Sequence, residues 1–309
     1  MPWWSLSRVF SSRRNRGSLP LAPVVVAASG RSGTTLLMQI LATSPQIAFD
    51  RIYAYENAYI AYLLTWAKLP LDGATKSESW RRAAIDHPEF VSKKGFAGGI
   101  PWSPRPSIEA DDKGAGWVQD VFPAVWDAFS ERAAVAHEVD HGDAVRPTYY
   151  AETAPLWVLD SLSEIMPSKG IHLIRDPRDQ WSSIMAFNEQ RGRLSFGVQP
   201  TDTPESYAAR FAQRQRPLLE RAARMEAMRP SDRLVIRYED LILNMDGQID
   251  LMSSWLRVHL QSPAPAGNGH ATAHTPSQSV GRWSEDMPAA VLAILERELG
   301  DLLDVLGYR

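Results

Sequence analysis

Residues 24–37, "VVVAASGRSGTTLL", constrain the fold of this 309-residue chain more than any other stretch. The small apolar run at 24–28 predicts a buried strand. Gly30 and Gly33 allow a tight turn in which the backbone can approach a ligand closely. Residues 34–41 then place apolar side chains at helical spacing. The stretch therefore predicts a strand, a turn and the start of a helix.

The predicted turn has the features of an anion-binding site. The first N–H groups of a helix lack intrahelical partners and lie at the positive end of the helix dipole, so a phosphate or sulfate fits there. Arg31 adds a planar set of donors that suits a tetrahedral anion. The candidate ligands are the residues of the turn: Ser29, Gly30, Arg31, Ser32, Gly33, Thr34 and Thr35. A plain connecting turn without a ligand is the alternative.

The turn does not match the nucleoside-triphosphate pattern G-x-x-x-x-G-K-[ST]. Ala28 stands where the first glycine belongs, and Thr34 stands where the lysine belongs. The dinucleotide pattern G-x-G-x-x-G also fails. The sequence therefore argues against an ATPase or kinase of the usual kind.

Composition excludes several classes of protein. The chain has no cysteine, which excludes disulfides, thiolate catalysis and cysteine-ligated zinc. Its net charge of -3 gives no overall attraction to nucleic acid. No apolar run approaches the roughly 18 to 20 residues that a membrane span needs. We expect a cytoplasmic protein in which residues 1–21 form a flexible basic arm; the sequence does not indicate its oligomeric state.

Strands and helices alternate along the rest of the chain. We predict strands at 47–49, 170–174 and 233–242, and helices that include residues 54–68 and 154–166. This alternation predicts an α/β fold with a mainly parallel sheet. Ligands in such sheets bind outside the carboxyl ends of the strands.

A second candidate anion site lies in "LIRDPRDQWSS". Arg175 follows the strand that ends at Ile174, and Asp176 with Pro177 is typical of a helix entry. Ser183 lies eight residues after Arg175, within the next helix. The alternative is that these residues only cap the helix and form surface ion pairs.

Together the two stretches resemble the PAPS-dependent sulfotransferases, where PAPS is 3′-phosphoadenosine 5′-phosphosulfate. The arginine in "SGRSGTT" is similar to the bacterial, tyrosylprotein and Golgi carbohydrate members. The resemblance implies that this loop holds the 5′-phosphosulfate and that Arg175 and Ser183 hold the 3′-phosphate. It also implies that Tyr238 of "RYEDL" contacts the adenine region, and that the "GRW" motif covers the cofactor through Gly281, Arg282 and Trp283.

The resemblance also implies an architecture and a reaction. Residues 22–309 would form one P-loop-like domain, with an acceptor-side insertion at about 66–150. The enzyme would transfer a sulfuryl group from PAPS to a hydroxyl or amine of a small-molecule, glycan or peptide acceptor, giving adenosine 3′,5′-bisphosphate. Arg31, with Thr34 and Thr35, would stabilise charge in the transition state, and no metal would be needed.

The catalytic base is the least defined part of the expected site. Asp50, Glu56 and Glu152 are the candidates to accept the proton of the acceptor. None of them matches the family position cleanly, and "ETAP" at 152–155 lacks the lysine of the K-T-P found in many members. For each carboxylate the alternative is a surface or helix-capping role.

Two other functions compete with sulfuryl transfer. "HEVDH" at 137–141 satisfies the H-E-x-x-H pattern of zinc metalloproteases. Against it, Asp140 adds a charge, Gly142 ends any helix, and the flanking residues look turn-like. The other alternative is a nucleotide-binding protein that keeps both anion sites but lacks a working base.

Overall fold

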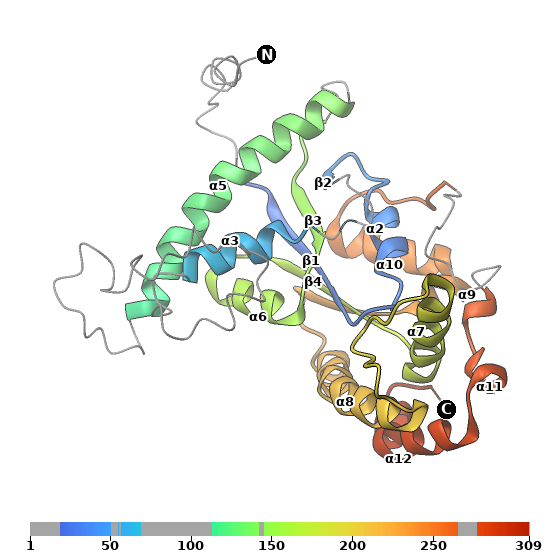
Figure 1. The fold of residues 1–309 in the computed structure, drawn as a ribbon. Helices are drawn as coiled ribbons and strands as arrows, with labels where there is room; N and C mark the ends of the chain where they lie inside the picture. Colours follow the sequence, from blue (N-terminus) through green and yellow to red (C-terminus); the bar gives the residue numbers. More distant parts are fainter. Residues whose placement is uncertain are drawn as a thin grey trace.

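The computed structural model describes residues 19–50, 55, 57–68, 113–141, 145–264 and 277–308. One sheet holds the strands in the order β2-β3-β1-β4-β5, and every neighbouring pair is parallel. The strands are β1 (Ala22–Ala28), β2 (Ile47–Phe49), β3 (Tyr149–Thr153), β4 (Lys169–Ile174) and β5 (Arg233–Arg237). Helices flank the sheet (Figure 1), which confirms the predicted α/β fold.

The helices follow the strands in alternation along much of the chain. They are α2 (Thr34–Leu41), α3 (Tyr59–Lys68), α5 (Lys113–His141), α6 (Leu156–Ile165), α7 (Pro177–Arg191), α8 (Pro204–Met228), α9 (Tyr238–Leu243), α10 (Met245–Leu256), α11 (Trp283–Asp286) and α12 (Ala289–Val305). A short 3₁₀ turn, η2, spans Ser277–Ser279.

The central strand β1 is buried on both faces, because it supplies side chains to two different cores. Val24 and Val26 pack in the cluster that contains α2, α9 and α10. Val25 and Ala27 point the other way and pack in the cluster that contains α3, α5 and α6. A third cluster joins α7, α8 and α12 beside β4. The short β-branched run of β1 therefore suits a strand covered on both sides.

Three elements differ from the sequence-based expectation. Residues 113–141 form the long helix α5, where the sequence predicted no helix. Residues 149–153 form the unpredicted strand β3, which lies between β1 and β2. The strand predicted at 233–242 ends at Arg237 and continues as α9. Each difference depends on packing against distant parts of the chain, which local patterns do not record.

Parallel strands bring their carboxyl ends to one edge of the sheet. Ser29 follows β1, Asp50 follows β2, Arg175 follows β4 and Tyr238 follows β5. Four segments that are far apart in the sequence thus meet at the edge where ligands bind in folds of this kind.

Some expectations concern residues outside the described parts of the chain. These are residues 1–18 of the predicted arm, the candidate base Glu56, and residues 69–112 and 142–144 of the predicted insertion. Within the described part of that insertion, α5 packs against α3, and Tyr149 and Tyr150 already belong to β3. None of the helices described here has the length and apolar character of a membrane span.

Candidate active site

The loop from Ser29 to Gly33 has the backbone of an anion site. Arg31 and Gly33 both have positive φ angles, 68° and 93°. Gly33 precedes α2, whose first turn has no acidic residue and no side-chain cap. Gly33 must also be a glycine for space, because a Cβ there would lie 2.3 Å from Cδ2 of Tyr238. The N-terminal end of α2 therefore has neither a side-chain cap nor an acidic residue in its first turn, an arrangement that suits an anion.

Arg31 connects this loop to α7. Its Nε donates a hydrogen bond to Oγ of Ser183 over 3.2 Å, and its guanidinium lies 4.8 Å from the centre of the Phe187 ring. The sequence assigned Arg31 to the 5′-phosphosulfate and Ser183 to the 3′-phosphate of the same nucleotide. The structure places them in direct contact, so the two predicted anion sites form one continuous polar surface.

Arg175 is almost fully buried at the centre of this surface. Its Nη1 donates to the carbonyl of Arg31 over 2.9 Å, and its Nη2 donates to the carbonyl of Ser279 over 2.6 Å. The guanidinium also lies 4.5 Å from the centre of the Tyr238 ring. Its Nε is buried and has no hydrogen-bond partner. A buried donor of this kind normally has a partner, which makes Arg175 Nε a candidate donor to an anion.

Tyr238 and the "GRW" segment close the other side of the surface. The Tyr238 hydroxyl lies 2.7 Å from Oγ of Ser279. Asp179 accepts from the N–H of Gly281 over 2.7 Å and from the N–H of Trp283 over 3.0 Å. The first turn of α7 therefore fixes the backbone of this segment beside Arg175.

The remaining arginines of the two motifs have different roles. Arg178 pairs with Asp176 at 2.8 Å, and its guanidinium lies 4.0 Å from the Trp283 ring centre. Asp176 also caps α7 by accepting from the Arg178 N–H. Arg282 pairs with Asp286 one helical turn further on. Asp176 thus caps the helix, as the alternative interpretation expected. Its ion pair with Arg178 is buried, however, and does not lie on the surface.

A group of acidic side chains lies at the ends of β2 and β3. Glu152 is buried, and its Oε1 accepts from the N–H of Ile60 over 2.8 Å at the start of α3. Its Oε2 is buried without a hydrogen-bond partner. Burial raises the pKa of Glu152 to about 8, although backbone N–H groups lower it in part, and Asp50 raises it further. Burial, with the charges of Glu152 and Asp50, also raises the pKa of Tyr150 well above its usual value.

The "HEVDH" stretch lies at the end of the long helix α5, so the expectation of turn-like residues before it was wrong. His137 and His141 stack with ring centres 4.0 Å apart. Nε2 of His137 lies 2.8 Å from the carbonyl of Pro45, and Glu138 pairs with Arg146. Within the described residues, no group of three or more His, Asp or Glu side chains is arranged to hold a metal. The geometry therefore gives no support to a zinc protease.

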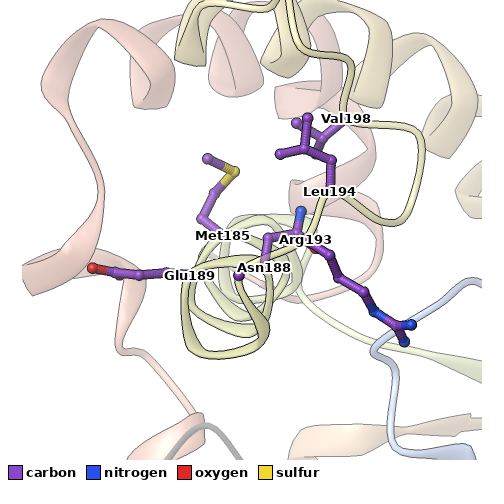
Figure 2. A pocket seen from close by; sticks show the side chains of 7 residues that line it. Met185, Asn188, Glu189, Arg193, Leu194 and Val198 are labelled. Atoms are coloured by element: carbon purple, nitrogen blue, oxygen red, sulfur yellow. The ribbon is translucent and has the colours of Figure 1, made fainter.

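A cavity of about 400 Å³ lies beside the C-terminal half of α7 (Figure 2). The described residues around it are Met185, Asn188, Glu189, Gly192, Arg193, Leu194 and Val198. None of them was predicted as a site residue. The same segment carries Phe196, whose ring packs closely against Gly30. A Cβ added to Gly30 would lie 2.5 Å from Cδ1 of Phe196.

Sequence reasoning missed several residues that build the site. Ser279, Asp179, Phe196 and Gln180 hold the loop and the "GRW" segment through contacts across long stretches of sequence. Asp179 and Gln180 stand within the quoted motif "RDPRDQWSS", but nothing local indicates which distant groups they bind. Only the fold brings these partners together.

Comparison with known proteins agrees with this geometry. The model of a family described as "Sulfotransferase family" matches residues 23–262. The sulfotransferase domain of the Synechococcus PCC 7002 olefin synthase has a similar fold, with a TM-score of 0.52 and 17% identity over 94% of this chain and 97% of that one. The sulfotransferase domain of the curacin biosynthetic pathway aligns with a TM-score of 0.48 and 15% identity, over 93% of this chain and 98% of that one. No curated protein sequence matches the chain significantly.

The family match covers both predicted anion sites and the start of α9, from β1 through "RYEDL". These are the segments that meet at the carboxyl edge of the sheet. The chain belongs to the sulfotransferase family.

Proposed function

We propose that this chain transfers a sulfuryl group from PAPS to a hydroxyl or amine of an acceptor molecule. PAPS carries a phosphosulfate on the 5′ carbon and a phosphate on the 3′ carbon of the same ribose, so it needs two adjoining anion-binding positions. The loop 29–35 supplies one position, and Arg175 with Ser183 supplies the other. The buried, unpartnered Nε of Arg175 is the observation that carries this proposal, because an anion would satisfy it.

The residues of the loop act on the charge that develops during transfer. As the acceptor oxygen bonds to sulfur, the bond between sulfur and the leaving phosphate oxygen breaks, and negative charge grows on that oxygen. Arg31 and the first N–H groups of α2, at Thr34 and Thr35, would stabilise this charge. The products are a sulfated acceptor and adenosine 3′,5′-bisphosphate.

The proton of the acceptor needs a base, and Asp50 is the better of the two described candidates. Asp50 follows β2 at the carboxyl edge and is partly exposed. Glu152 is buried, caps the start of α3, and has a pKa raised to about 8, so it is mainly protonated at neutral pH. We therefore assign the base to Asp50 and a supporting role to Glu152, with Glu56 as a further candidate outside the described residues.

Incubation of the purified protein with ³⁵S-labelled PAPS and a metabolite and protein extract tests the proposal. We expect label to move from PAPS to an acceptor, and adenosine 3′,5′-bisphosphate to accumulate in equal amount. The Arg31→Ala variant is the matched control. A protein that binds the bisphosphate but moves no label would instead be the non-catalytic nucleotide-binding protein.

A further inference from the structure

Gln180 joins the first turn of α7 to the phosphosulfate loop, 150 residues earlier in the chain. Gln180 is 1% exposed. The amide Nε2 donates to the carbonyl oxygen of Gly30 and to Oγ of Ser29 over 2.7 Å, and lies 3.3 Å from Oγ of Ser32. Because a carbonyl only accepts hydrogen bonds, the Gly30 contact fixes which end of the Gln180 amide faces the loop.

This contact determines how one peptide group of the loop is oriented. A trans peptide is planar, so the C=O of Gly30 and the N–H of Arg31 point in opposite directions. With the carbonyl held by Gln180, the N–H of Arg31 points away from the Gln180 amide. Arg175 holds the carbonyl of Arg31 in the same way, which orients the N–H of Ser32.

The loop needs such ties because its backbone is strained. Arg31 has a φ angle of 68°, a left-handed conformation that a residue with a side chain adopts at a cost. Strain of this kind persists only where the surroundings hold it. Gln180 and Arg175 bind the two peptide groups on either side of the Arg31 Cα, so together they oppose relaxation of this residue.

We propose that Gln180 is a positioning residue that keeps the Gly30–Arg31 peptide turned so that its N–H can bind the anion at the loop. The inference rests on the proposed function, because it requires the 5′ end of the nucleotide to lie at this loop. It adds a residue that acts on the anion through the loop atoms it holds, above all the Gly30 carbonyl.

The test measures the share of affinity that comes from the 5′-phosphate. Calorimetry gives Kd for adenosine 3′-phosphate and for adenosine 3′,5′-bisphosphate. We call the first value divided by the second the 5′-phosphate ratio, which is high when the 5′-phosphate adds affinity. We expect Gln180→Ala to lower this ratio about tenfold, the effect of one hydrogen bond to a charged group. Affinity for adenosine 3′-phosphate should stay within about threefold of wild type, which general damage to the fold would not produce.

Gln180→Glu supplies a second, pH-dependent readout. A protonated glutamic acid can donate one hydrogen bond to the Gly30 carbonyl, whereas a carboxylate repels it. The ratio of this variant, relative to wild type, should therefore recover as the pH falls from about 8 to about 5.5, because burial raises carboxyl pKa values into this range. Gln215→Glu, a buried glutamine of α8, is the matched control and should show no recovery.

The outcomes separate this inference from the proposed function. A wild-type ratio near one would mean that the loop does not bind the 5′-phosphate. That result would contradict the proposed function itself, whatever Gln180 does. A high wild-type ratio that is unchanged in folded Gln180→Ala would overturn the role of Gln180 alone. If Gln180→Ala does not fold, the absence of low-pH recovery in Gln180→Glu overturns it instead.

Discussion

The two ends of the carboxyl edge of the sheet are built differently. The cofactor end comprises residues 29–35, 175–183 and 277–283. Here side chains hold backbone groups of neighbouring segments through hydrogen bonds. Arg175 and Gln180 hold carbonyl groups of the loop, and Asp179 holds two N–H groups of the "GRW" segment. The acidic end, which comprises Asp50, Tyr150 and Glu152, instead gathers acidic groups whose charges disfavour one another.

This difference matches the two tasks that sulfuryl transfer sets. Binding a nucleotide with fixed geometry requires donors that are already oriented when the ligand arrives. Proton transfer depends on the pKa values of nearby acidic groups, and burial together with the charge of Asp50 raises those of Glu152 and Tyr150. Under the proposed function, the cofactor end binds the nucleotide and the acidic end accepts the proton of the acceptor.

The acidic end gives the largest expected effect. We expect Asp50→Asn to lower kcat by about 10²- to 10⁴-fold, the usual contribution of a general base. Glu152→Gln should lower it less than about tenfold, because a glutamine carbonyl can still accept from the Ile60 N–H. Rates are measured with saturating ³⁵S-labelled PAPS once an acceptor is known.

The affinity for adenosine 3′,5′-bisphosphate is the control for this comparison and should be near wild type in both variants. The reverse ranking would make Glu152 the base. In that case the wild-type rate should also rise with pH up to about 8, the value to which burial raises the pKa of Glu152.

At the cofactor end, Arg31→Ala should reduce kcat by about 10²- to 10³-fold, the usual cost of removing one donor to a developing anion. Charge on the leaving oxygen grows as the bond to sulfur breaks, so the cation stabilises the transition state more than the ground state. Arg31→Lys should restore part of the rate because it returns the charge without the planar fork. The exposed Arg297→Ala is the matched control, and near-normal kcat in Arg31→Ala would show that the loop only binds.

Arg175→Ala should weaken binding of adenosine 3′,5′-bisphosphate by about 10- to 100-fold, because a charge-assisted contact to the 3′-phosphate is lost. Adenosine 5′-phosphate should lose less affinity, although the ties from Arg175 to the carbonyls of Arg31 and Ser279 are removed as well. Calorimetry compares the two ligands, with Arg233→Ala at the opposite edge of the sheet as control. An equal loss for both ligands would contradict the assignment of Arg175 to the 3′ end.

The smallest expected effect concerns stability. The pKa of Glu152 is raised from 4.5 to about 8 by burial, so the folded protein holds this proton more tightly than the unfolded chain does. The contribution of the protonated group to stability is therefore lost as the pH rises through this interval. The glutamine of Glu152→Gln does not titrate. We therefore expect the Tm of this variant minus that of wild type to increase by a few degrees as the pH rises from about 5 to about 8. A Tm difference that does not change with pH would show that Glu152 titrates normally.

The same contrast explains what could be predicted from the sequence. The loop 29–35 and the motif around Arg175 follow from local rules about strand ends, glycine turns and helix starts, so their places in the fold were predicted correctly. The contacts of Gln180, Asp179 and Ser279 could not be predicted, because each joins segments more than 100 residues apart. The burial of Glu152 depends on β3 and α3 meeting, and β3 lacks a distinctive local pattern.

The central claim is that two anion-binding positions, one at the loop 29–35 and one at Arg175 with Ser183, hold one nucleotide. Calorimetry of the wild-type protein with adenosine 3′,5′-bisphosphate, adenosine 5′-phosphate and adenosine 3′-phosphate tests it most directly. We predict that the bisphosphate binds at least about tenfold more tightly than either monophosphate, because each phosphate adds hydrogen bonds to charged groups. Equal affinity for the three ligands, or no binding of the bisphosphate, would contradict the claim.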